Sequence, residues 1–102
     1  MCVRIGCMTD APALPTLDFY QRADCSTCDE ARYALQQVLE DRVQRGVPIP
    51  RVRYIDIGGH SAFEAQFGYL VPVLVVSGRQ LSLTTSYQAI ARFLDSVLPR
   101  IA

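Results

Sequence analysis

Two cysteines, Cys25 and Cys28, stand three positions apart where a short strand pattern gives way to a long helical one. A strand that ends in a short turn and leads into a helix places the first of them at the helix N-terminus. Free backbone N–H groups and the positive end of the helix dipole stabilise a thiolate at that position. The pKa of a free cysteine, roughly 8.5, falls in such places to a range of about 3.5 to 7.5. We therefore expect a reactive Cys25, with Cys28 one turn into the helix and able to close a disulfide behind it.

The patterns around the cysteines predict a strand, a helix and a second strand. Residues 16–20 carry apolar side chains on one face, as a strand does, and residues 21–24 form the turn that follows. Residues 27–30 have the form of a capping box, and apolar side chains then recur at helical spacing up to Gly46. Residues 52–57 alternate as a second strand. Two strands joined by one helix predict a right-handed β-α-β unit.

The rest of the chain predicts a short helix, a hairpin and a final helix. The expected elements are a helix over 61–67 with a capping box made by Ser61 and Glu64, a strand over 71–76, a turn at Ser77-Gly78, a strand over 79–83, and a helix capped by Thr85 or Ser86 and stopped by Pro99. The order is β-α-β-α-β-β-α, an α/β fold with a mixed four-stranded sheet covered by three helices. We assign Phe63, Phe67 and Tyr69 to the core.

Length and composition indicate one domain that needs no cross-links to fold. Half of the 102 residues are hydrophobic, which is enough for a packed core. We interpret residues 1–15 as a flexible tail and residues 16–102 as the folded domain. Ten basic and ten acidic side chains cancel, so the charge balance does not favour binding to nucleic acid or to an anionic membrane.

The hydrophobicity of the chain bears on its compartment. No apolar stretch approaches the roughly 20 residues of a membrane-spanning helix, and the N-terminus lacks the continuous apolar region of a secretory signal. We therefore expect a cytoplasmic protein, acting as a monomer. In that compartment a Cys-x-x-Cys motif is typical of catalytic, redox-sensing or metal-binding roles rather than of a permanent structural bridge.

Two further cysteines, Cys2 and Cys7, leave a metal site as an alternative. Four cysteines can hold a tetrahedral zinc ion or an iron–sulfur cluster. Against this, a full strand separates the first pair from the second, and the second pair lies at a helix start. His60 is the single histidine and follows two glycines, which indicates a loop or helix-entry position rather than a ligand. We expect no metal.

Taken together, these motifs resemble the thioredoxin fold and, within it, the glutaredoxin-like proteins. The residues that carry the resemblance are Phe19-Tyr20 leading to Cys25-Ser26-Thr27-Cys28, then Gly68-Tyr69-Leu70-Val71-Pro72-Val73-Leu74, a glycine-containing hairpin and a C-terminal helix. The resemblance covers about residues 16 to 98. It implies thiol-disulfide exchange, in which Cys25 is the attacking thiol, Cys28 the resolving thiol, and Pro72 a cis-proline beside the disulfide.

Four more residues become site candidates alongside this resemblance. Val71 would pair its backbone with an extended substrate. Tyr20 and Arg22 would line the substrate groove, although an exposed aromatic and a solvated arginine are equally expected on a loop. Asp18 resembles a buried acid that shuttles a proton to the second cysteine. The alternative is an ordinary strand aspartate at a solvent edge.

The resemblance also implies partners. The expected substrates are protein disulfides or small thiols, with no tightly bound cofactor and with glutathione as a candidate co-substrate. A fold of this kind does not by itself establish turnover. A protein that keeps the fold but only binds its partner is therefore the alternative to an oxidoreductase.

Overall fold

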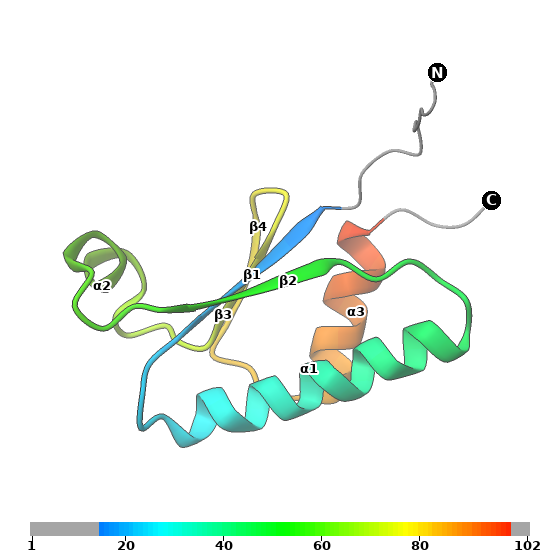
Figure 1. Cartoon of the computed structure of the whole chain (residues 1–102), viewed down its shortest axis with the longest axis horizontal. Coiled ribbons are helices and arrows are strands. Elements are labelled where there is room, and N and C mark those ends of the chain that lie inside the picture. The colour runs from blue at the N-terminus through cyan, green and yellow to red at the C-terminus, as the bar shows by residue number, and fades with distance from the viewer. Residues whose placement is uncertain (1–14, 99–102) are drawn as a thin grey trace.

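The computed structural model describes residues 15–98 and contains four strands and three helices in that range. Figure 1 shows them in chain order. They are β1 (Thr16–Gln21), α1 (Ser26–Gln44), β2 (Arg51–Asp56), α2 (Ser61–Phe67), β3 (Val73–Val76), β4 (Arg79–Ser82) and α3 (Tyr87–Val97). The predicted order β-α-β-α-β-β-α is confirmed. The expected tail, apart from Pro15, lies outside the described residues together with Cys2, Cys7 and the helix stop at Pro99.

The sheet is mixed, as predicted. β1 pairs in parallel with β2 and antiparallel with β3, and β3 pairs antiparallel with β4, which gives the order β2-β1-β3-β4. Helix α1 connects the two parallel strands. The turn between β3 and β4 lies at Ser77 and Gly78, whose φ angles are 51° and 79°. A two-residue type I′ hairpin requires positive φ at both positions, so the predicted turn is confirmed.

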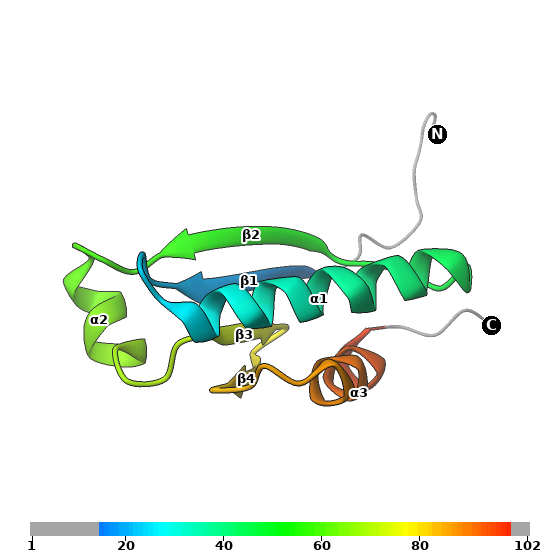
Figure 2. The ribbon, with the colours of Figure 1, turned by 90° about the horizontal axis from the view of Figure 1, so that it is seen from below.

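Alternation along the strands divides the apolar side chains between the two faces of the sheet. On one face they pack against α1 and α3 and form what we call the helix-covered cluster, and Figure 2 shows α1 running along the sheet. Its members are Leu17, Phe19, Ala31, Ala34, Leu35, Val38, Leu74, Val76, Ile90, Leu94 and Leu98. This cluster is the main core of the domain.

The opposite face of β1 contributes to a smaller core at one end of the sheet. We call it the site-end cluster, and it consists of Tyr20, Ile57, Phe67 and Val73. Figures 1 and 2 place α2 beyond this end of the sheet, beside the N-terminal end of α1. With seven residues, α2 is too short to be stable alone, so its position depends on this packing. None of the described helices has both the length and the apolar character that crossing a membrane would require.

The predicted capping box of α1 is wrong. The N-cap is Cys25, whose sulfur accepts a hydrogen bond from the Cys28 N–H, and Thr27 already lies inside the helix. Sulfur is not among the preferred capping groups, whereas a threonine hydroxyl is. Capping preferences therefore favour Thr27 over Cys25. At the other end the chain leaves the helix through Gly46, whose φ of 71° suits a glycine.

Two predictions around α2 are also wrong. Its N-cap is His60 without a side-chain hydrogen bond, so Ser61 does not cap it and Glu64 does not complete a capping box. His60 itself has the predicted helix-entry position. Tyr69 is 97% exposed, because it lies in the turn after the helix and not on the face that carries Phe67.

Candidate functional site

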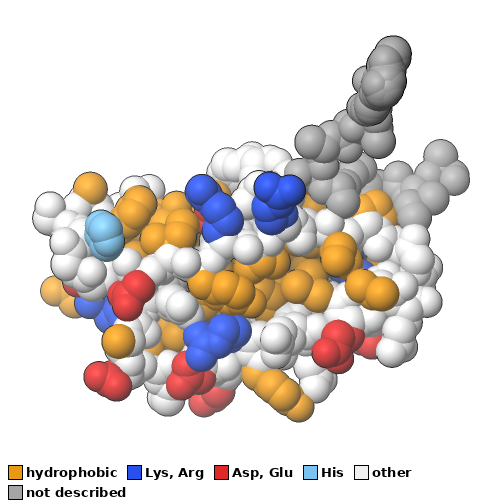
Figure 3. All heavy atoms as spheres, in the orientation of Figure 1, with side chains coloured by type: hydrophobic (Ala, Val, Ile, Leu, Met, Phe, Trp, Pro, Cys, Tyr) orange, Lys and Arg blue, Asp and Glu red, His pale blue; other side chains and the backbone are white. Residues whose placement is uncertain are grey.

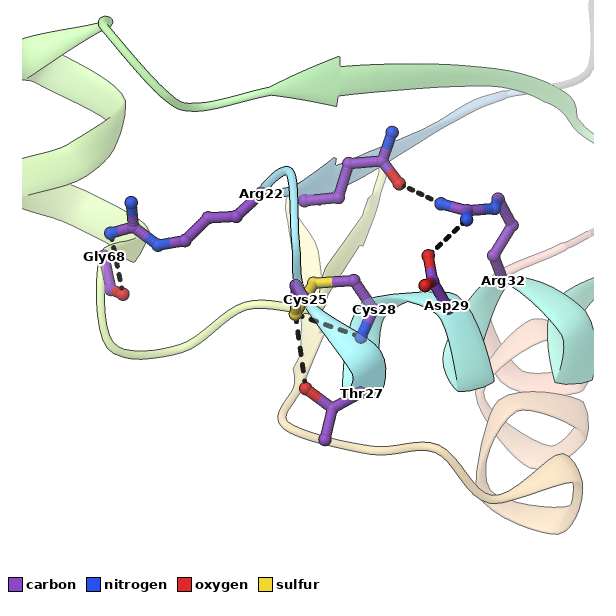
Figure 4. Close-up of a disulfide and its surroundings, with 8 residues drawn as sticks. Arg22, Cys25, Thr27, Cys28, Asp29, Arg32 and Gly68 are labelled. Carbon is purple, nitrogen blue, oxygen red and sulfur yellow. Dashed lines mark hydrogen bonds and ion pairs between the residues drawn. A yellow bond between two sulfur atoms is a disulfide. The ribbon is translucent and has the colours of Figure 1, made fainter.

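Cys25 and Cys28 form a disulfide at the beginning of α1, with their Cα atoms 5.2 Å apart (Figure 4). Cys28 is fully buried in the first turn of the helix, whereas Cys25 precedes the helix and is partly exposed. An incoming group can therefore reach the sulfur of Cys25 more easily than that of Cys28.

The first turn of α1 directs hydrogen-bond donors at the sulfur of Cys25. Cys25 has extended backbone angles, with φ −118° and ψ 103°, as an N-cap residue does. The Cys28 N–H donates to Cys25 Sγ over 3.1 Å, and the Thr27 hydroxyl lies 3.3 Å from the same sulfur. A thiolate at Cys25 would accept from both groups and would also be stabilised by the helix dipole.

Asp18 and Tyr20 lie on the face of β1 opposite α1. The Asp18 carboxylate accepts a hydrogen bond of 2.8 Å from Arg53 Nε on β2, and this bond raises the pKa of Arg53. Asp18 is thus not brought to Cys28, which belongs to the helix on the other face. This is the arrangement of an ordinary strand aspartate.

Tyr20 is a core residue. It is 9% exposed, and its ring lies 4.4 Å from that of Phe67 and 5.2 Å from that of Phe63, measured between centroids. Burial, followed by the charge of Asp18, raises the pKa of the Tyr20 phenol. Tyr20 therefore packs in the site-end cluster, and its place along a substrate groove stays a prediction.

Arg22 joins the segment before Cys25 to α2. Its guanidinium donates to both carboxylate oxygens of Glu64, with 2.9 Å between Nη1 and Oε2, and to the Gly68 carbonyl over 3.1 Å. The hydrogen bond to Glu64 raises the pKa of Arg22. Figure 4 shows this side chain directed toward Gly68 and away from the disulfide. Arg22 thus makes an internal contact, which differs from its predicted place along a substrate groove.

The segment that follows α2 contains the predicted cis-proline. The Val71–Pro72 peptide bond is cis and the ring of Pro72 is buried. β3 begins at Val73 and not at the predicted Val71. The Leu83 N–H donates to the carbonyls of Leu70, at 3.2 Å, and Pro72, at 2.9 Å. These bonds hold the segment after β4 against residues 68–72, which we call the proline segment.

Sequence reasoning missed Glu64, Gly68 and Leu83 as residues that shape the site. Glu64 was interpreted only as part of a capping box, and its partner Arg22 is 42 positions away. Of the three, Gly68 had a signal in the sequence, since it begins the motif that contains Pro72. A Cβ atom there would lie 2.5 Å from the Glu64 carbonyl oxygen, so this close approach requires glycine.

The metal alternative finds no site within residues 15–98. No three potential ligands among histidine, cysteine, aspartate and glutamate are grouped in that range. His60 instead packs its ring against Phe63, with 5.8 Å between ring centroids. Cys2 and Cys7 were part of the predicted alternative and fall outside the described range.

The chain is similar to a known protein family and to solved structures. The family described as Glutaredoxin-like domain matches residues 16–95. An X-ray structure of the Northeast Structural Genomics target protein XcR50 from X. campestris is 31% identical with a TM-score of 0.66, and the match covers 78% of this chain and 96% of that one. A solution structure of XcR50 is 30% identical with a TM-score of 0.61, covering 83% and 97%. No curated protein matches the chain.

Proposed function

The chain belongs to the family of glutaredoxin-like domains, and from this membership we propose that it is a thiol-disulfide oxidoreductase acting through Cys25 and Cys28. One observation carries the proposal. The partly exposed sulfur of Cys25 accepts the Cys28 N–H at the start of a helix of 19 residues. This is the environment that favours a thiolate and hence nucleophilic attack.

The exchange proceeds through a mixed disulfide. The Cys25 thiolate attacks one sulfur of the substrate disulfide, whose bond breaks and releases the other sulfur as a thiolate. Cys28 then gives up its proton to that leaving thiolate and attacks the Cys25 sulfur, which releases the second substrate thiolate, to be protonated from solvent. Two electrons pass to the substrate, and the protein is left with the Cys25–Cys28 disulfide.

The segment around Pro72 is the proposed substrate-binding edge. Val71 precedes β3 and pairs its backbone with an extended substrate chain, in the manner of an added strand. Pro72, the next residue, is buried. Arg22 acts indirectly, by tying the segment before Cys25 to Gly68 at the other end of the proline segment.

The partners of the exchange are protein disulfides or small thiols. The proposed reductant is a small thiol, with glutathione as one candidate, or a protein dithiol. No tightly bound cofactor takes part in the mechanism, since both sulfurs are supplied by the chain itself. We place the exchange in the cytoplasm, where glutathione and thioredoxin systems return the disulfide to the dithiol.

Two measurements test the proposal: catalytic turnover with a disulfide substrate, and trapping of the mixed disulfide. The wild type should catalyse reduction of insulin by dithiothreitol, Cys25→Ser should abolish this, and Cys28→Ser should accumulate the mixed disulfide, detectable by mass spectrometry. Alkylation of the reduced protein should modify Cys25 first. Absence of turnover in a protein whose two thiols are reduced would contradict an oxidoreductase and would support a protein that only binds its partner.

A further inference from the structure

The arginines near the disulfide are neutralised by the protein itself. Figure 4 shows two of them, Arg22 and Arg32. Arg22 forms an ion pair with Glu64, and Arg32 forms one with Asp29. Arg32 also donates to the side chain of Gln21. Neither arginine is therefore free to attract an anionic group to the Cys25 sulfur.

Within residues 15–98, two carboxylates close to the disulfide have no such ion-pair partner. Asp24 immediately precedes Cys25, and Glu30 lies two positions after Cys28. Both side chains are exposed, and the ion pairs found within residues 15–98 include neither of them. Figure 3 shows acidic side chains over the N-terminal end of α1. The immediate surroundings of the disulfide thus carry a net negative charge.

A groove of about 520 Å³ begins directly after Cys28 and follows α1 toward the start of α3. Among the described residues its lining consists of Asp29, Glu30, Tyr33, Ala34, Gln37, Thr85 and Tyr87, and both charged side chains of this set are acidic, with Asp29 paired to Arg32. Tyr33 is 65% exposed and Tyr87 38%. The Tyr87 hydroxyl donates a hydrogen bond to the Asp41 carboxylate, which brings a third carboxylate close to the lining. Exposed aromatic rings and carboxylates together favour a cationic side chain.

We propose that this site selects disulfides that carry positive charge, in particular protein disulfides with a lysine or arginine near the cystine. The cationic side chain enters the groove beside Tyr33 while the substrate sulfur meets Cys25. The inference rests on the proposed exchange reaction and specifies its substrate class. It also predicts that glutathione disulfide, which is anionic, is a poor substrate for its size.

The expected size of the effect follows from simple electrostatics. A unit charge about 8 Å from a cation in water changes the local concentration of the cation about two- to threefold. Asp24 and Glu30 together should then favour a cationic disulfide about fivefold at low salt. At 0.5 M salt the screening length falls to roughly 4 Å, and most of this preference should disappear.

Three small disulfides of similar size test the charge preference. They are cystamine, which is cationic, 2-hydroxyethyl disulfide, which is neutral, and 3,3′-dithiodipropionate, which is anionic. Each rate constant with the reduced protein is divided by the rate constant of dithiothreitol with the same disulfide, which removes differences in intrinsic reactivity. The neutral disulfide then corrects for any change in the Cys25 thiolate itself.

We expect the wild type to prefer cystamine, and the double variant Asp24→Asn/Glu30→Gln to lose about fivefold of that preference. Glu40→Gln is the matched control, because it removes an exposed carboxylate from the same helix about 20 Å further along. An unchanged preference in the double variant, or a faster reaction with the anion, would overturn the inference. Failure to react with all three disulfides would instead contradict the proposed function.

The groove is tested with two peptide disulfides that differ only in arginine or its neutral analogue citrulline next to the cysteine. Tyr33→Leu should reduce the preference for arginine about two- to fivefold, the contribution expected of an exposed cation–π contact. Tyr33→Phe keeps the ring and should keep the preference. An equal loss in both variants, or no loss in either, would exclude this groove as the place where the cation binds.

Discussion

The helix-covered cluster and the site-end cluster are held together in different ways. The first is a closed apolar layer in which side chains such as Phe19, Leu35 and Leu74 have no exposed surface. The second is smaller, is built on a pair of aromatic rings from Tyr20 and Phe67, and is covered by the short helix α2 and the segment that follows it. Large apolar burial stabilises the domain, while the smaller cluster shapes the site.

The disulfide lies where these two regions meet. α1, which begins at the cysteines, packs in the helix-covered cluster, whereas Val71 and Val73 pack in the site-end cluster. The distance between the attacking sulfur and the substrate-binding edge therefore depends on both. A change in the first region should alter global stability, and a change in the second should alter the site with less effect on stability.

The largest difference is expected between two phenylalanines. Phe19→Ala should lower the free energy of unfolding by about 3–5 kcal/mol, because it removes a fully buried ring from the main core. Phe67→Ala should mainly allow α2 to unfold locally. The loss in free energy of unfolding then cannot exceed the free energy of that local opening. Chemical denaturation gives the first quantity and amide hydrogen exchange of residues 61–67 the second. Equal global destabilisation by both variants would remove the distinction between the clusters.

A buried arginine should give the next largest effect. Arg42 is 4% exposed and donates to the Pro48 carbonyl over 2.7 Å and to Asp95 over 2.8 Å. Arg42→Met keeps most of the volume but removes both hydrogen bonds, and because water can reach Asp95 in the variant the cost should be about 1–2 kcal/mol. The exposed Arg45 provides the control, and Arg45→Met should change the melting temperature little. If the two variants melt alike, the bridge from α1 to α3 does not stabilise the main core.

The contact between Arg22 and Glu64 should affect the site more than the stability. Arg22→Gln should raise the KM for a protein disulfide several-fold at nearly constant kcat and melting temperature, because the two segments beside the disulfide are no longer tied together. Gly68→Ala should act in the same direction, since its Cβ would meet the Glu64 carbonyl oxygen at 2.5 Å.

A double-variant cycle sharpens this result. Arg22→Gln and Glu64→Gln should be non-additive in KM, because each removes the same contact. Strictly additive effects would mean that the two side chains act separately, and the site-end region would then not depend on their pairing.

The smallest effect concerns alkaline pH. Burial raises the pKa of Tyr20 above its unfolded value of about 10, so the neutral phenol contributes fully to stability below that pH. The contribution is lost as the pH rises through the folded-state pKa. Tyr20→Phe should therefore lose less stability than the wild type between pH 9 and 11, as measured by denaturation. The exposed Tyr33 is the control, and a Tyr33→Phe variant with the same gain would contradict the assignment to the site-end cluster.

The local features of the fold were predictable because their signals lie within a few residues. Apolar spacing identified α1, the Ser77-Gly78 pair identified the hairpin turn, and Ser86 was one of two caps expected for α3, where it accepts from the Ala89 N–H. The position of Cys25 at a helix start follows from the same local pattern. The N-caps of α1 and α2 were not predicted. Capping preferences do not anticipate a cysteine sulfur, or a histidine whose side chain makes no capping hydrogen bond.

The sequence by itself determined the order of elements, the cysteine pair at the N-terminus of α1 and the motif that contains Pro72. Backbone preferences and periodicity are local properties. Tertiary structure alone decided which partners Asp18 and Arg22 take, Arg53 at 35 positions and Glu64 at 42. It also exposed Tyr69 and buried Tyr20. The physical reason is that strand register and the position of α2 arise from packing between distant segments, which no local pattern encodes.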